Sequence, residues 1–175
     1  MSRAFVVSAF PGCGKSTFYR ENSIYSETSN GKLKILDSDS SLFSWIYDEN
    51  GNKTDVRDPE FPNNYISHIK AHIESEDIIF VSSHKIVREA LEREGIPYIM
   101  VYPDKSLKEE WIKRFRDRGN DEAFIKFQED HWDEFLDDMS KETYPNHYVI
   151  DNPNYGIDNN FIAYLTMIIG SSGDR

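Results

Sequence analysis

The sequence is poor in cysteine and in long apolar runs. Cys13 is the only cysteine among 175 residues, which excludes a disulfide within the chain and is typical of proteins from a reducing compartment. The longest apolar run near the end, FIAYLTMII at 161–169, is shorter than the roughly 18 residues that suggest a membrane span. The start also lacks the ordered basic, apolar and cleavage regions of a secretion signal. We therefore expect a cytoplasmic protein that does not cross a membrane.

Positive charge is scarce as well. Lysine and arginine number 20 against 31 aspartates and glutamates, which gives a net charge of −11. Such a charge disfavours broad binding to long nucleic acids, but it is compatible with a local basic cleft. The length fits one domain with a proper hydrophobic core, residues 1–175. Whether the chain forms a homodimer stays open at this stage.

A glycine-rich turn stands between an apolar stretch and two hydroxyl residues near the start, FVVSAFPGCGKST at 5–17. The apolar stretch predicts a buried strand, and Gly12 and Gly14 let the backbone turn tightly and approach a ligand. A helix then begins close to Lys15, and its free amides attract anionic oxygens. Lys15 adds a charge for the outer phosphates, and Ser16 offers a hydroxyl to Mg²⁺. The pattern predicts a phosphate-binding loop, with Ala9 at the usual first glycine position.

The rest of the chain alternates between apolar strands and amphipathic helices. Such alternation predicts an α/β fold whose parallel sheet is covered on both faces. A polar stretch at 48–62 is expected to be a long surface excursion. The strands are expected at about 4–10, 32–37, 77–83, 97–103 and 147–151. The helices are expected at about 14–21, 41–47, 63–75, 85–94, 106–118, 121–139 and 159–169.

Two carboxylates follow the second predicted strand, at the edge where parallel sheets bind ligands. Of Asp37 and Asp39, one can hold Mg²⁺, usually through water, and the other can orient or deprotonate an attacking hydroxyl. The alternative is that one of them caps a short helix while the other is solvated. Because the phosphate-binding loop lies about 20 residues earlier, we favour the functional interpretation.

Arginines gather in the segment EEWIKRFRDRGND at 109–121. Arg114 and Arg118 are four residues apart and share a helix face, whereas Arg116 points elsewhere. Two guanidinium groups on a lid segment, about 106–125, can close over a transferring phosphate and neutralise its charge. A solvated basic face paired with neighbouring glutamates is the alternative.

The helix after the third predicted strand supplies two more candidates. Arg88 is placed to bind an anionic group of the acceptor, or else to form a surface salt bridge with nearby glutamates. His84 at the strand end can hydrogen-bond to the substrate or serve a structural role. Together with Asp39, these residues make up the expected acceptor site, within an acceptor-binding segment at about 38–75.

AFPGCGKST, LDSD and the late arginines together resemble the P-loop kinases of the nucleoside monophosphate kinase, shikimate kinase and polynucleotide 5′-kinase group. The resemblance implies a three-layer α/β/α P-loop NTPase fold with a five-stranded parallel sheet and a helical lid. It also implies ATP and Mg²⁺ as cofactors, with Asp37 and Ser16 on the metal and Asp39 on the acceptor. The residues expected to bind the ATP phosphates are Gly12, Cys13, Gly14, Lys15, Ser16 and Thr17.

The function expected from these features is ATP-dependent phosphotransfer, with a nucleoside monophosphate as the first candidate acceptor. Lys15, Asp39, Arg114 and Arg118 are the expected catalytic residues. Transfer to a polynucleotide 5′-hydroxyl or to a small metabolite is the alternative within the same class. A nucleotide-binding regulator with slow hydrolysis is the alternative from another class, because the third strand ends in Ser-Ser-His instead of an aspartate.

Overall fold

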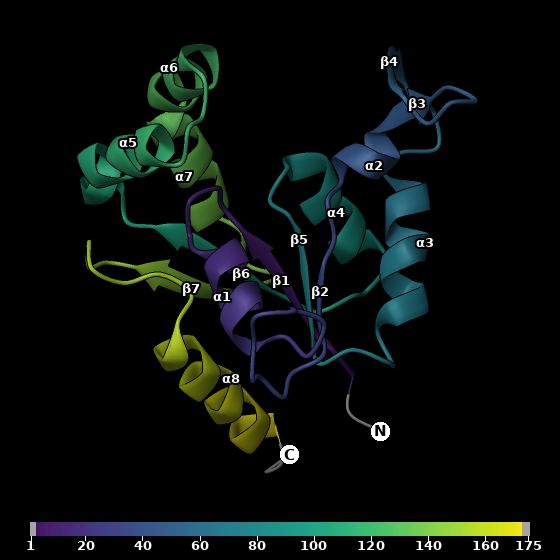
Figure 1. Cartoon of the computed structure of the whole chain (residues 1–175). Coiled ribbons are helices and arrows are strands. Elements are labelled where there is room, and N and C mark those ends of the chain that lie inside the picture. Colours follow the sequence, from purple (N-terminus) through teal and green to yellow (C-terminus); the bar gives the residue numbers. More distant parts are fainter. Residues whose placement is uncertain (1–2, 173–175) are drawn as a thin grey trace.

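Five parallel strands form the central sheet of the computed structural model, which describes residues 3–172 (Figure 1). They lie in the order β2-β5-β1-β6-β7, so the first strand of the chain occupies the middle of the sheet. The strands are β1 (Phe5–Ala9), β2 (Ile35–Asp37), β5 (Ile78–Ser82), β6 (Tyr98–Pro103) and β7 (Asn146–Ile150). The α/β class and the parallel sheet predicted from the sequence are thus confirmed.

The most apolar strands lie at the centre of the sheet. In β5, the side chains of Ile78 to Val81 are at most 1% exposed, and all of β6 is buried. Strands buried on both faces read as continuous apolar runs, which is why the sequence identifies them so clearly. β2 lies at an edge and is shorter than expected, because only Ile35–Asp37 pairs with β5.

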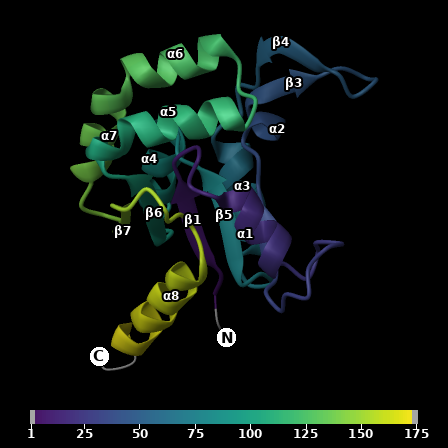
Figure 2. The same ribbon diagram turned by 60° about the vertical axis from the view of Figure 1, so that its left-hand side comes forward.

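Helices cover both faces of the sheet (Figures 1 and 2). On one face, the rings of Phe18 in α1 (Lys15–Asn22) and Phe161 in α8 (Asn159–Ser172) lie 6.3 Å apart. α3 (Asn63–His72) contacts α4 (Lys85–Arg93). α3 and α4 cover the other face of the sheet. Right-handed crossovers between the parallel strands account for this distribution of helices over the two faces.

Three further helices lie between β6 and β7. They are α5 (Lys108–Asp117), α6 (Glu122–Asp130) and α7 (Trp132–Ser140), and a short 3-10 turn at Lys105–Leu107 precedes them. The single helix expected at 121–139 is therefore two helices that meet at His131, whose φ and ψ are −106° and 8°. Within the described residues, no helix has both the length and the apolar character that a membrane crossing requires.

The segment after β2 differs from the expectation. The helix predicted at 41–47 ends early, as α2 (Ser41–Ser44), and an antiparallel hairpin of β3 (Trp45–Tyr47) and β4 (Lys53–Arg57) replaces much of the expected surface excursion. Aromatic and β-branched side chains favour the strand at 45–47. The turn is closed by Asp48, whose Oδ1 accepts the amides of Asn50 and Asn52.

Arg88 lies in the core and not at the sheet edge where the acceptor was expected to bind. Its side chain is 4% exposed and forms ion pairs with Asp138 and Glu142. Its Nε also donates to the carbonyl of Ser83 at 2.9 Å. The acceptor-binding role expected for Arg88 does not fit this position, because its guanidinium already joins α4 to α7 and to the loop after β5.

We predict that Arg88→Met lowers the free energy of unfolding by about 3 kcal/mol, because it leaves two carboxylates without their buried partner. Lys85 also pairs with Asp138, but its side chain is 60% exposed, so Lys85→Met should cost less than about 1 kcal/mol. Urea unfolding of both variants measures the difference. Equal losses would contradict a structural role of Arg88.

Candidate functional site

A cleft of about 980 Å³ lies at the carboxyl ends of the strands. It brings together residues from the turn after β1, from α1, from the ends of β2 and β5, and from α5. Every residue expected at the site except Arg88 lines it. The lining residues with predicted roles are Gly12, Cys13, Gly14, Lys15, Ser16, Thr17, Asp37, Asp39, His84, Arg114 and Arg118.

The glycine-rich turn is held by three consecutive carbonyl groups. The carbonyl of Pro11 accepts a hydrogen bond from Trp111 Nε1 at 2.9 Å, and that of Gly12 accepts one from Arg114 Nη1 at 3.1 Å. The carbonyl of Cys13 accepts from the amide of Ile157 at 2.7 Å. Two segments more than 90 residues away in the chain therefore fix the turn.

These bonds determine the direction of the amides. In a planar trans peptide the N–H points opposite to the C=O of the same unit. Because carbonyls 11 to 13 are bound to the surrounding framework, the amides of residues 12 to 14 are directed away from it. Gly12 and Gly14 have φ values of 83° and 97°, which favour glycine. The result is a set of backbone donors next to the start of α1, suited to an anion.

Arg114 stabilises the glycine-rich turn through hydrogen bonds to the backbone, which does not suit a mobile lid residue. Besides Gly12, its guanidinium donates to the carbonyls of Pro153 and Tyr155, both at 2.9 Å, and it stacks over the Trp111 ring at 3.9 Å. These contacts use most of its donors. The arginine lines the cleft, yet it cannot swing onto a phosphate without releasing the turn.

The loop after β7 packs closely on the glycine-rich turn. A Cβ atom on Gly156 would lie 2.7 Å from the carbonyl oxygen of Cys13. Glycine at this position therefore allows the backbone approach that the Ile157–Cys13 hydrogen bond requires. The same loop carries Asn152 to Asn154, and the carbonyl of Pro153 within it accepts a hydrogen bond from Arg114.

Cys13 takes part through its backbone alone. Its side chain is 1% exposed, and burial raises the pKa of the thiol to about 12. The Sγ atom points to the carbonyl of Val101 at 3.9 Å. At neutral pH the thiol stays protonated and is a poor nucleophile.

Three further cations surround the cleft. Lys15 forms no ion pair with any residue in the described part of the chain. Arg118 stacks over Phe115 at 5.5 Å, and its Nε donates to Asn120 at 3.0 Å. Arg20 was not expected here, although its position one turn after Ser16 on α1 was a usable signal. Arg116 is absent from the lining and lies near Glu122 at 4.0 Å.

The two aspartates occupy different settings. Asp39 Oδ1 accepts the amide of Ser41, the first residue of α2, at 2.8 Å. The cap position of that helix is Ser40, so Asp39 does not occupy it. Asp37 is exposed in the cleft. Tyr65 fixes the wall that carries both: its hydroxyl donates to the carbonyl of Ser38 at 2.7 Å and accepts the amide of Ser82 at 3.3 Å.

The donors in the cleft suit Mg²⁺. Ser16 and Asp37 offer a hydroxyl and a carboxylate, both exposed in the same cleft. Mg²⁺ is commonly bound by one or two carboxylates together with substrate phosphates and water. The described residues contain no cluster of three or more His, Cys, Asp or Glu side chains that would form an all-protein metal site. A metal that arrives with a nucleotide fits this arrangement.

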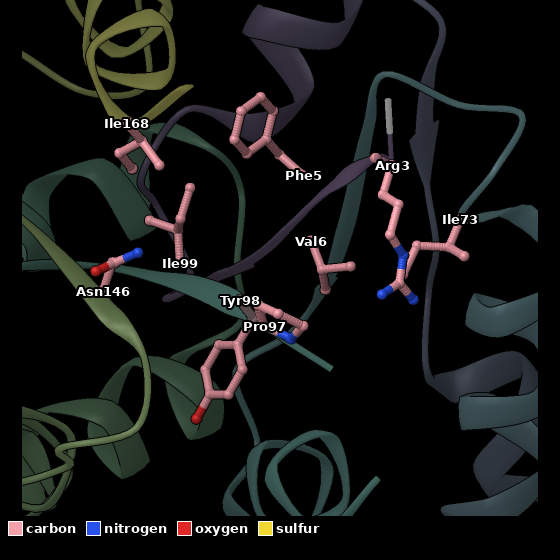
Figure 3. Close-up of a pocket in the computed structure, with 10 residues that line it drawn as sticks. Arg3, Phe5, Val6, Ile73, Pro97, Tyr98, Ile99, Asn146 and Ile168 are labelled. Atoms are coloured by element: carbon pink, nitrogen blue, oxygen red, sulfur yellow. The ribbon is translucent and has the colours of Figure 1, made fainter. Parts of the chain in front are cut away.

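A second cavity, of about 200 Å³, lies at the opposite end of the sheet. Figure 3 shows apolar side chains such as Phe5, Val6 and Ile99 around it. The cation at its rim, Arg3, lies 3.6 Å from Glu74. Without the glycine-rich turn or an acidic pair, this cavity offers no comparable chemistry.

No family model matches the chain, and no curated protein matches it significantly. The functional interpretation therefore rests on the geometry of the cleft.

We predict that Gly156→Ala destabilises the protein by about 1–3 kcal/mol, because the new Cβ forces the loop away from Cys13. Gly170→Ala is the control, since no heavy atom lies within 4 Å of its added Cβ in α8. That change should be neutral or stabilise by roughly 0.5–1 kcal/mol. Thermal unfolding of both variants tests the close approach, and an unchanged melting temperature for Gly156→Ala would contradict it.

Proposed function

We propose that the protein is an ATP-dependent phosphotransferase that moves the γ-phosphate to a small acceptor. The observation that carries this proposal is the meeting, in one cleft, of the glycine-rich turn with Lys15 and a pair of aspartates from the neighbouring wall. A protein that only binds a nucleotide needs the glycine-rich turn and Lys15. It does not need a second wall that carries a carboxylate opposite the phosphates.

The nucleotide half of the cleft is fixed by hydrogen bonds to the carbonyls of Pro11, Gly12 and Cys13. Backbone amides of residues 12 to 14 and the start of α1 would hold the phosphates, with Lys15 on the outer ones. Ser16 and Asp37 would hold Mg²⁺, which neutralises charge on the β- and γ-phosphates when bound. The loop at 152–154, fixed through Arg114, would contact the base.

Arg118 is the arginine best suited to the transferring phosphate. It lines the cleft, and the one hydrogen bond of its side chain to a described residue goes to Asn120, two residues later. A guanidinium group that reaches the γ-phosphate stabilises charge as the P–O bond breaks. Arg114 contributes indirectly, by holding the turn.

We expect Lys15→Ala to abolish ATP turnover and Arg118→Ala to lower kcat by about 10²-fold or more, with little change in stability. Turnover is followed as ADP release from Mg²⁺-ATP in the presence of a panel of acceptors. Titration calorimetry with ATP measures binding separately from chemistry.

Arg116→Ala is the matched control, because Arg116 lies on the same segment but outside the cleft. Its kcat should stay within about twofold of the wild type. The proposal fails if wild-type protein shows no ATP binding that depends on Lys15. If Arg116→Ala impairs turnover as strongly as Arg118→Ala, the role assigned to Arg118 is wrong.

A further inference from the structure

One side of α5 lies directly against the glycine-rich turn. Four side chains in or just after this helix follow one another at spacings of three and four residues, which places them on the same side: Trp111, Arg114, Phe115 and Arg118. The first two donate hydrogen bonds to successive carbonyl groups of the turn, and the last lines the cleft. The turn and the guanidinium of Arg118 are therefore attached to one helix, two turns apart.

The contact between α5 and the turn is close. A Cβ atom on Gly12 would lie 3.0 Å from Nε1 of Trp111 and 3.2 Å from a ring carbon of Phe115. Both aromatic side chains are 0% exposed, and buried rings of this kind cover about 150–250 Å² each. A movement that lifted α5 off the turn would expose both rings to water and break the hydrogen bond of the indole N–H.

Two further segments hold α5 in place. The guanidinium of Arg114 donates to the carbonyls of Pro153 and Tyr155, in the loop after β7. The ring of Phe115 meets that of Phe124 in α6 edge-on, with 5.3 Å between the ring centres. α5 is thus fixed to the glycine-rich turn, to the loop after β7 and to α6. Moving it as a separate body would disrupt all three contacts at once.

Arg118 takes its position from the end of α5. Its backbone amide donates to the carbonyl of Arg114 at 3.0 Å, and its guanidinium lies over the Phe115 ring at 5.5 Å. The hydrogen bond from its Nε goes to Asn120 and not to the glycine-rich turn. The separation between the guanidinium and the amides of the turn is therefore set through α5, and the hydrogen bond of Trp111 is one of the links that fix it.

In an inference that rests on the proposed function, we infer that α5 is a fixed part of the phosphate site and that Trp111 is its positioning residue. Trp111 is absent from the lining of the cleft, so it acts without touching the nucleotide. It sets the separation between the amides that would bind the phosphates and the guanidinium of Arg118. The closing movement expected for the segment 106–125 then does not include α5. A guanidinium held in place beforehand needs no reorganisation when charge develops on the transferring phosphate.

The role of Trp111 is tested with Trp111→Phe, which keeps an aromatic ring and removes the indole donor. We expect kcat to fall about tenfold or more, because Arg118 is displaced from the phosphate, and ATP to bind more weakly, because the turn is less well fixed. In the Arg118→Ala background, the same change should lower kcat by less than about twofold, while its effect on ATP affinity remains. ADP release with the acceptor that reacts gives kcat, and titration calorimetry gives the affinity.

Tyr98→Phe is the matched control for the loss of one buried hydrogen bond. The hydroxyl of Tyr98 donates to Glu142 at 2.8 Å, and the side chain is 3% exposed. Tyr98 begins β6, at the end of the strand away from the cleft. Its removal should lower the melting temperature but leave kcat and ATP affinity within about twofold of the wild type. All rates are measured well below the melting temperatures of the variants.

The position of α5 is also measured with Trp111 intact. Spin labels attached through Lys113→Cys and Glu21→Cys report the distance between the exposed sides of α5 and α1. Cys13 does not take a label, because its side chain is 1% exposed and burial raises its pKa to about 12. On addition of Mg²⁺ and a non-hydrolysable β,γ-imido analogue of ATP, we expect the distance to change by less than about 2 Å.

The outcomes distinguish this inference from the proposed function. A larger shift between the labels would overturn the fixed position of α5 and leave phosphotransfer intact. Equal losses of kcat for Trp111→Phe in the wild-type and Arg118→Ala backgrounds would show that Trp111 does not position Arg118. A loss of kcat in Tyr98→Phe as large as that in Trp111→Phe would reduce the role of Trp111 to stability. Absence of ATP binding that depends on Lys15 would overturn the proposed function, and this inference with it.

Discussion

The hydrogen bonds to the carbonyls of Pro11, Gly12 and Cys13 are the constraint on which the cleft depends. They orient three successive peptide units, and with them the amides that would meet a phosphate. Each bond is worth only about 0.5–1.5 kcal/mol net, but together they set a direction that a free glycine-rich loop would not keep. Their donors, on α5 and at Ile157, tie the first loop of the chain to elements more than 90 residues later.

Local sequence signals were sufficient for the sheet and for the glycine-rich turn. Buried parallel strands are continuous apolar runs, and Gly12 and Gly14, which marked the tight turn in the sequence, adopt the positive φ angles that glycine tolerates. The rule that ligands bind at the carboxyl ends of such strands placed Asp37, Asp39 and His84 correctly at the cleft. These predictions worked because each depends on backbone geometry that a short stretch of chain determines.

Features that depend on remote partners were not predictable. Nothing near Arg88 indicates that Asp138 and Glu142, 50 and 54 residues later, will draw it into the core. The bracing role of Arg114 likewise depends on carbonyls at 12, 153 and 155. The hairpin at 45–57 was missed because its strands are short and its turn composition resembles an irregular loop. In each case the spacing of residues in the sequence was compatible with more than one arrangement, and tertiary contacts determine which one forms.

Trp111 connects the glycine-rich turn to the aromatic core. Its ring lies 6.5 Å from that of Trp132 in α7, which in turn meets the ring of Phe10 edge-on at 5.8 Å. The packing of these helices is therefore connected, through Trp111, to the conformation of the glycine-rich turn. By thermodynamic linkage, a ligand that binds the amides of the glycine-rich turn stabilises the packing of α5 and α7. A change that loosens this packing lowers the binding free energy of the ligand by the same amount. The affinity of the proposed nucleotide site would therefore depend in part on the aromatic core.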